Sequence, residues 1–414
     1  MKEQLKIDFE KLLEKSNFSN KNIEFKRKSL NNFIDNGFPN KKEENWKFSD
    51  LNQIITKNIT NLSFYNDLSK PNKIDQHIFI DSLEHNKLVF VNGRLEKVDF
   101  YYEEKNQIEI LDDINLEKSN NNNSLISLNN AFVEKYFKLI IKKNYSLKKP
   151  LVFYNITNKD LISKNINLRV DILLEENSSL KVVEHSDDKS ITNFMNLNCN
   201  FDLHKNSVLK IYKVDYNSNS NLKYCYNNIN QDSNSVAEIF LLSCGSDFIK
   251  NEINCNLNGK YASAFVNGVF VLNKTKHHEI KTNINHLIEN TKSYQLIKGV
   301  LEDKSKAVYQ GKIFVSPKAQ KTDGYQLSNA ILLNDNTEFN AKPELEIYAD
   351  DVKCSHGSTS GSLNEDSIFY LMSRGLNYQE SKKLLINGFL LDVVEKITDN
   401  EIKDTIKNIM DLKQ

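Results

Sequence analysis

The residues in this sequence best suited to bind a metal are Cys354 and His356, in the run Cys354-Ser355-His356-Gly357. If the chain from Val352 onward is an extended strand, the two side chains lie on one face, about 7 Å apart along the strand. A thiolate and an imidazole both bind iron, but one of each does not complete a cluster, so the remaining ligands would come from another chain or from small thiols. Alternatively, Cys354 packs as a small apolar residue beside a solvent-facing His356.

A second group of possible ligands is His277, His278 and His286. Adjacent residues of a strand point to opposite faces, so His277 and His278 would not bind one ion together. His286 could approach either of them only if the chain folds back. We therefore interpret all three as surface or turn histidines.

The other cysteines have the pattern of core residues. Cys199 and Cys255 each alternate with apolar residues two positions before and after them. We expect packing roles for these two and for Cys225 and Cys244. Because the five cysteines include no CxxC pair and form an odd, scattered set, they are typical of reduced thiols in a reducing compartment.

Several motifs of other enzyme classes are absent from the sequence. There is no GxxxxGK[ST] phosphate loop, no GxGxxG motif, no GxSxG elbow and no HExxH zinc motif. We therefore expect this chain to bind no nucleotide and to hydrolyse no ATP, and we identify no catalytic residue.

Charge and hydropathy exclude two further classes. Lys+Arg and Asp+Glu both number 55, so the chain lacks the basic excess of a nucleic-acid-binding protein. The N-terminus lacks the apolar core of a signal peptide, and no apolar run approaches the roughly 20 residues needed to cross a bilayer. The sequence predicts a cytoplasmic protein with no membrane segment.

The first of three regions, residues 1–135, is helical and mixed. Apolar residues at helical spacing predict helices that end at Gly37 and Pro39. The apolar segment 88–95 predicts a strand that contains an Asn-Gly turn. The asparagine run 120–123 predicts an exposed loop, and we attribute it to an AT-rich genome rather than to a functional tract.

The second region, residues 136–350, alternates like short strands. Apolar residues fall at every second position in many short runs, which polar clusters separate and no clear helix interrupts. This pattern predicts a sandwich, a barrel or a parallel β-helix, and periodicity alone does not choose among them. No exact internal repeat is visible, which argues against a regular solenoid but leaves an irregular one open.

The third region, residues 351–414, is predicted to be a helical domain. A short helix around residues 368–372 ends at Gly375, and a longer one spans about 378–397. Thr398 and Glu401 have the spacing of a capping box at the start of a last helix.

Several ordered motifs resemble those of the SufB/SufD family of iron–sulfur cluster assembly scaffolds, from about residue 37 to residue 395. The chain has the Cys-Ser-His-Gly form found in the SufD type, whereas SufB has a Glu-bearing variant and more cysteines. Residues 358–361, Ser-Thr-Ser-Gly, depart from the usual Ala-Thr-Val-Gly, which affects the packing beside the motif. The matching segments are GFP at 37–39, ENWKF at 44–48, GKIFV at 311–315, AQKTDGYQ at 319–326, KPELEIYADDVKCSHG at 342–357 and FYLMSRG at 369–375.

The resemblance implies a mainly β fold, a right-handed parallel β-helix core between N-terminal and C-terminal helical regions. It also implies a non-catalytic scaffold subunit that pairs with a SufB-like subunit and binds a SufC-like ATPase through its C-terminal helices. A transient iron–sulfur cluster would be assembled at the interface between the two scaffold subunits. His356 is then the first candidate ligand and Cys354 the second.

Two alternative functions remain from the sequence. The first is a homodimeric scaffold that acts without a SufB-like subunit. The second is a β-helical carbohydrate-active enzyme, which would use clustered carboxylates or bound calcium. Asp350 and Asp351 form the only acidic pair beside Cys354, and no signal peptide is evident, so the sequence favours the scaffold.

Overall fold

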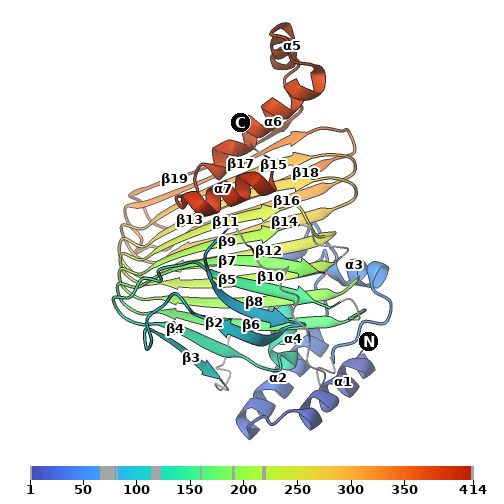
Figure 1. Ribbon diagram of the computed structural model, residues 1–414, viewed down its shortest axis with the longest axis vertical. Helices are drawn as coiled ribbons and strands as arrows, with labels where there is room; N and C mark the ends of the chain where they lie inside the picture. Colours follow the sequence, from blue (N-terminus) through green and yellow to red (C-terminus); the bar gives the residue numbers. More distant parts are fainter. Residues whose placement is uncertain are drawn as a thin grey trace.

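The chain forms a two-sheet parallel β-helix with helices at both ends of the sequence (Figure 1). The computed structural model describes residues 2–65, 80, 83–112, 123–158, 161–188, 192–216 and 221–411. In most of the described core, successive strands alternate between the two sheets, and each strand pairs in parallel with the strand two positions along the chain. Of the three β architectures left open by periodicity, the structure is the β-helix.

Ten strands form one sheet, here called sheet A. In spatial order they are β19 (Val352–Gly361), β17 (Thr322–Leu332), β15 (Lys292–Leu301), β13 (Ser263–Leu272), β11 (Val236–Ser243), β9 (Val208–Asp215), β7 (Ser179–Asp188), β5 (Leu151–Thr157), β1 (Asn86–Val91) and β2 (Arg94–Asp99).

Nine strands form the opposite sheet, here called sheet B. In spatial order they are β18 (Glu338–Ile347), β16 (Lys306–Val315), β14 (His277–His286), β12 (Phe248–Leu257), β10 (Leu222–Gln231), β8 (Phe194–Leu203), β6 (Asn165–Leu174), β4 (Phe137–Ile141) and β3 (Ile108–Asp112).

The core lies between the two sheets. Inward residues alternate with outward ones along each strand, as the sequence period predicts. Ile253 and Cys255 of β12, for example, are fully buried and contribute to one large apolar cluster. Cys199 and Cys225 belong to the same cluster, so the predicted packing roles of these three cysteines are confirmed.

A turn that recurs once per coil explains why the chain can stack without an exact sequence repeat. Asn177, Asn206 and Asn234 each adopt the left-handed conformation, with φ of 60°, 59° and 58°. Asparagine tolerates this region better than most residues. The hydroxyl of the serine that follows each of them donates to the carbonyl three residues before that serine, at 2.7, 2.6 and 2.6 Å. The repeat is therefore a local conformation, which the Asn-Ser pairs mark in the sequence.

The two ends of the β-helix are finished differently. At the first coil, β2 and β3 lie antiparallel to β1 and β4 and form the outermost strands. The β1–β2 hairpin turns at Asn92 and Gly93, both with positive φ, which confirms the predicted Asn-Gly turn. At the last coil, β18 and β19 are outermost, and each pairs with one described strand.

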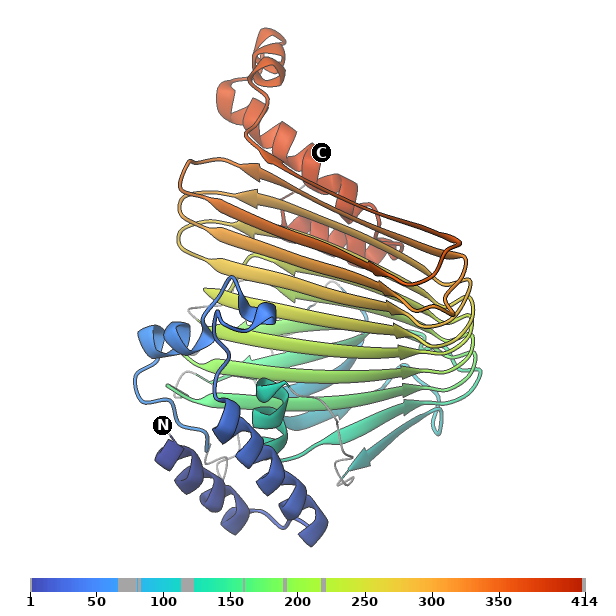
Figure 2. The ribbon, with the colours of Figure 1, turned by 180° about the vertical axis from the view of Figure 1, so that it is seen from behind.

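The N-terminal helices cover the outer face of sheet B (Figure 2). Phe9, Leu30 and Phe33, from the predicted helices, pack in one apolar cluster with Phe194 and Phe248 at the starts of two strands. The helical elements here are α1 (Lys2–Lys15), α2 (Asn20–Asn36), the 3₁₀ helix η1 (Glu44–Trp46), α3 (Leu51–Asn58) and α4 (Ser124–Phe132).

The C-terminal helices α5 (Glu365–Ser373), α6 (Tyr378–Val394) and α7 (Asn400–Ile409) begin after β19. Residues of α6 and α7, including Val393 and Ile406, are buried against the outer face of sheet A. Helix α5 and the start of α6 project away from the β-helix in both views (Figures 1 and 2). None of the described helices is both long and apolar enough to span a bilayer.

The structure differs from some of the local predictions. The N-cap of α7 is Asp399, whose carboxylate accepts from the Ile402 amide at 3.2 Å, so the predicted Thr398 cap is wrong. The Thr398 hydroxyl instead donates to Glu238, 3.2 Å away. Of the asparagine run, residues 120–122 lie outside the described residues, and Asn123 caps α4. The division at residues 135 and 350 stays a prediction, and strand β19 continues the β-helix beyond residue 350.

The histidines of the second candidate group are parts of strand β14, and the prediction of surface or turn positions is wrong for His278 and His286. Both are fully buried. The ring of His278 bonds to the Ser243 hydroxyl and the Ser246 carbonyl, at 2.8 and 2.6 Å. His286 bonds to two hydroxyls, at 2.7 and 2.9 Å. Burial lowers the pKa of each imidazole to about 4, so both rings are neutral near pH 7.

We expect valine at a left-handed turn position to destabilise the fold more than glycine does. Asn206→Val should lower the free energy of unfolding by about 1–2 kcal/mol relative to Asn206→Gly, because a β-branched side chain is strained at positive φ. Both variants lose the Asn206 amide bond to Asn177, so their difference isolates the backbone. Urea unfolding of the two variants measures this difference in the free energy of unfolding. Equal stabilities would contradict the role of the left-handed backbone at residue 206.

We expect acid to destabilise the β-helix through His278 and His286. Their folded pKa of about 4 lies below the unfolded value of about 6.5, so the unfolded chain takes up protons first. Their stabilising contribution is complete above pH 6.5 and falls as the pH drops toward 4. Unfolding measured across this window should depend less on pH in His286→Gln, whereas the exposed His204→Gln should match the parent. A profile unchanged by His286→Gln would refute this.

Candidate functional site

Cys354 and His356 lie on β19, the outermost strand of sheet A. The expected extended conformation is confirmed, because this strand runs from Val352 to Gly361. In its parallel register with β17, Cys354 pairs with Gly324 and His356 with Gln326. Since the two residues are two positions apart in a strand, their side chains share one face.

That face is the interior of the β-helix. Cys354 packs against a small apolar cluster that includes Ile313 and Val315, inward residues of β16. A Cβ atom added to Gly324 would lie 3.4 Å from the Cys354 sulfur, so the absence of a side chain there makes room for the thiol. The site is therefore the inner lining of the last coil.

The two side chains differ in exposure. Cys354 is half-buried, and burial raises the pKa of its thiol despite the opposing hydrogen bond with the Gly324 backbone. The thiol is thus protonated near neutral pH, and a metal that binds it must displace the proton. His356 is exposed and available to a ligand or partner. The packing of Cys354 is confirmed, and its role as a ligand stays a prediction.

A buried polar row lies directly behind His356. Gln326, its register partner, is fully buried, and the Tyr309 hydroxyl lies 3.4 Å from the Gln326 side-chain oxygen. The same hydroxyl donates to the Gln295 side-chain oxygen, 3.1 Å away. Burial raises the pKa of Tyr309, which keeps its proton. The sequence patterns considered above did not predict this row, although polar residues at inward positions of apolar strands are a signal for it.

Gly311 is required by the same row. A Cβ atom at this position would lie 2.3 Å from both the Tyr309 hydroxyl and the Gln326 side-chain oxygen. Neither group could stay in place beside a larger residue, since both are buried and hydrogen-bonded. The glycine that opens the GKIFV motif therefore has a steric function next to the candidate site.

The structure does not gather further ligands around Cys354. No group of three or more His, Cys, Asp or Glu side chains able to hold a metal occurs within the described part of the chain. His277 contacts Glu279 at 3.0 Å on the outer face. The buried rings of His278 and His286 are hydrogen-bonded to residues outside strand β14, among them Ser243 and Thr291. The two predicted ligands come together, and the second histidine group does not join them.

The remaining cysteines are buried or hydrogen-bonded thiols with no role at this site. Burial raises the pKa of Cys225 to about 11 and that of Cys255 to about 12. The Cys244 thiol donates to the Asp215 carbonyl at 3.1 Å. None of the five cysteines is in a disulfide.

Comparisons with known proteins agree with the motifs. A family model described as "SUF system FeS cluster assembly, SufBD core domain" matches residues 155–389, more than half of the chain. The chain is 27% identical over 386 residues to the iron–sulfur cluster assembly protein SufD of Escherichia coli (strain K12), covering 91% of this chain and 89% of that protein.

Other relatives carry related names. A SufBD family protein of Synechocystis is 24% identical over 393 residues, covering 87% of this chain and 84% of its own length. The chloroplastic protein ABCI7 of Arabidopsis thaliana is 28% identical over 247 residues, covering 58% and 52%. With the family model across the β-helix and the Cys-Ser-His-Gly motif on its last strand, the chain belongs to the SufBD family of iron–sulfur cluster assembly proteins and is of the SufD type.

Proposed function

We propose that the chain is a scaffold subunit that pairs with a SufB-like subunit through the outermost strands β18 and β19. A nascent iron–sulfur cluster is assembled at that interface as cargo, with ligands from both subunits. A SufC-like ATPase binds the projecting C-terminal helices and supplies the energy of ATP hydrolysis, since this chain has no phosphate-binding loop. We place the complex in the cytoplasm, where five free thiols remain reduced.

The observation that carries this proposal is the difference between the two ends of the β-helix. Antiparallel strands β2 and β3 complete the first coil. β2 and β3 also leave one edge open within the described structure, but they are only six and five residues long, whereas β18 and β19 at the last coil are ten residues long each. Both strands are exposed or only half-buried along their whole length. An open edge is a template for pairing with another chain, so this end is suited to a partner subunit.

The candidate ligands lie at this open end, which links partner binding to cluster assembly. Because no further described coil covers β19, Cys354 and His356 line the interior at the open end, which a partner seated on this edge would cover. Two ligands are too few to hold a cluster, so the others must come from outside this chain. A partner bound at this edge could supply them. His356 is the stronger candidate, since its ring is exposed and needs no rearrangement of the core.

A homodimer is the closest alternative, because two copies could pair through the same edges. Nothing in the edge itself excludes a second copy of this chain. Co-expression with a distinct SufB-like chain separates the two: recovery of a mixed dimer supports the proposal, and recovery of the homodimer alone supports the alternative.

The surface proposed for the ATPase is made by α5 and the first half of α6. Phe369, Tyr370 and Leu384 are 74%, 57% and 51% exposed, an unusual cluster of apolar side chains on a projecting element. Asn364, Tyr370 and Leu384 are among the residues that line a groove between the two helices. Such a groove suits an apolar surface of a folded partner.

We expect His356→Ala to lower the yield of iron–sulfur cluster in the assembled complex. The substitution is on the surface, so folding and partner binding should change by no more than about 0.5 kcal/mol. The exposed His204→Ala is the matched control. Cys354→Ala should have the smaller effect on yield, because its thiol is also a packing group. Iron and sulfide analysis of anaerobically prepared complexes measures the yield, and normal assembly by His356→Ala would defeat the ligand proposal.

We expect Leu384→Asp to weaken ATPase binding at least tenfold, because a desolvated carboxylate in an apolar interface costs well over about 1.4 kcal/mol. Ile7→Asp is the matched control, since both residues are helical and 51% exposed. A point variant is preferable to deletion after Tyr378, which would uncover the outer face of sheet A beneath α6 and α7. Pull-down and calorimetry with the purified ATPase measure binding, and full affinity in Leu384→Asp would refute this docking surface.

A further inference from the structure

A pocket of about 550 Å³ lies on the outer face of sheet A, beneath the end of α6 and the segment that leads to α7. This volume is in the range of small-molecule sites. The pocket is on the opposite side of the sheet from Cys354 and His356, because most of its floor consists of outward residues of β9, β11, β13, β15 and β17. It has no part in the proposed cluster assembly.

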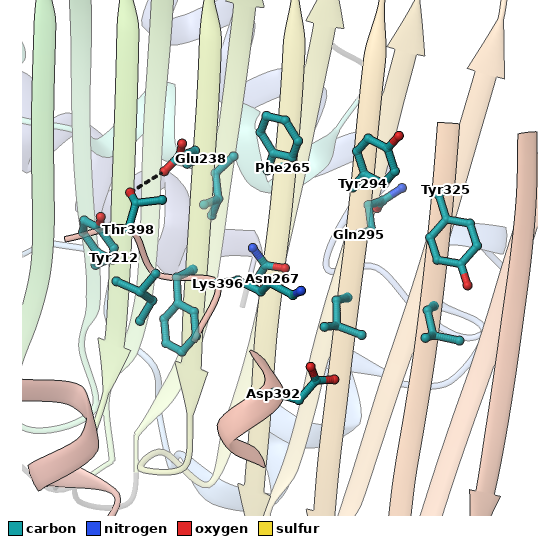
Figure 3. Close-up of a pocket in the computed structure, with 15 residues that line it drawn as sticks. Tyr212, Glu238, Phe265, Asn267, Tyr294, Gln295, Tyr325, Asp392, Lys396 and Thr398 are labelled. Atoms are coloured by element: carbon teal, nitrogen blue, oxygen red, sulfur yellow. Dashed lines mark hydrogen bonds between the residues drawn. The ribbon is translucent and has the colours of Figure 1, made fainter. Parts of the chain in front are cut away.

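The floor of the pocket is an aromatic platform, defined here as Phe265, Tyr294 and Tyr325. These residues are register partners on three neighbouring strands. The rings of Phe265 and Tyr294 are nearly parallel, at 6° with centroids 6.0 Å apart, and Figure 3 shows the faces of all three rings toward the viewer. Tyr294 and Tyr325 are 39% and 38% exposed, so their rings are open to a ligand.

The platform is held in a fixed orientation. The Tyr294 hydroxyl donates to the Asp323 carboxylate at 2.5 Å. The strands below are fixed by the sheet, and the pocket is closed at one side by Tyr212 and Phe240. A rigid, flat, apolar surface of this kind favours the face of a planar ring over a branched aliphatic group, because the flat face makes the larger contact.

The charged side chains around the pocket differ in whether they are already paired within the protein. Glu238 is paired with Lys210 at 3.1 Å and accepts from Thr398. Asp392 is paired with Lys298 at 2.8 Å. Lys396 also lines the pocket, and its charge attracts the Asp392 carboxylate, although no hydrogen bond or ion pair within the described residues engages its ammonium. Asp323 lies at the edge of the platform, where its carboxylate accepts from the Tyr294 hydroxyl. The positive charge is therefore on the Lys396 side of the pocket, and there it favours an anionic group on the ligand.

A peptide or a sugar fits this pocket less well. The backbone groups of the floor are used in the sheet, so an extended peptide would find few partners for its own amides. A sugar needs several polar side chains around its ring, whereas two of the carboxylates here are already paired and most of the lining is aromatic or aliphatic.

We propose that this pocket binds a small planar aromatic anion, with its ring system on the platform of Phe265, Tyr294 and Tyr325 and its anionic group toward Lys396. The ring contacts supply most of the affinity, and Lys396 selects charged ligands over neutral ones. The site is independent of the proposed cluster assembly, and loss of one would not affect the other.

Isothermal titration of the full chain with naphthalene-2-carboxylate tests the proposal. We expect saturable binding of one molecule per chain. Naphthalene-2-carboxamide, which is planar but uncharged, should bind about fivefold more weakly. Adamantane-1-carboxylate, which is charged but not planar, should bind about tenfold more weakly.

Substitutions of residues that line the pocket test whether the ligand binds there. Tyr294→Ala should weaken binding of the carboxylate about tenfold, and Tyr294→Phe should restore it, since the ring face is the contact. Lys396→Gln should remove the preference for the carboxylate over the carboxamide. Tyr348→Ala and Lys11→Gln, both at exposed positions away from the pocket, should bind like the parent. Absence of saturable binding, or binding unchanged by both Tyr294→Ala and Lys396→Gln, would overturn the proposal.

Discussion

The hydrogen-bond ladder between successive coils is the interaction on which the rest of this structure depends. Each strand in the middle of the β-helix uses its backbone groups on both sides, so the stack is satisfied everywhere except at its two ends. At the first coil, the chain itself supplies antiparallel strands β2 and β3 as the last members of each sheet. At the last coil the ladder stops at β18 and β19. The Cys-Ser-His-Gly motif lies on β19, where Cys354 packs against the core and His356 is exposed at the end of the stack.

The register of the ladder also organises the interior. Register partners stay in line from coil to coil, so His356 lies beside Gln326. The Tyr309 hydroxyl reaches Gln326 from the opposite sheet and extends this polar row inward from the open end. The row requires Gly311, since any side chain there would overlap the buried polar groups. Farther inside, His278 and His286 occupy the same kind of inward position and are fully hydrogen-bonded. The β-helix therefore tolerates polar interior residues where a neighbour in the stack satisfies them.

The helices cover only part of the outer surface of the two sheets. Those at the N-terminus cover sheet B, and α6 and α7 cover part of sheet A. Neither group covers the open edges of the last coil. Helix α5 extends away from the body and presents Phe369 and Tyr370 to solvent, and the segment between α6 and α7 leaves the aromatic pocket beside it. The edge proposed for a partner subunit, the surface proposed for the ATPase and the pocket are thus separate parts of the molecule.

The sequence by itself determined the local features of this protein. Two-residue alternation identified the strands and the packed cysteines, Asn92-Gly93 identified the hairpin, and Gly37 and Gly375 marked helix ends, because each depends on the conformation of a few neighbouring residues. The Cys354 and His356 pair was also evident, since a strand places both on one face. Tertiary structure alone decided that β19 is an outer strand, that His278 is buried, and that Asp399 rather than Thr398 caps α7. These outcomes depend on which strands pair. Because paired strands are separated in sequence by a full coil of the β-helix, no pattern of neighbouring residues predicts the pairing.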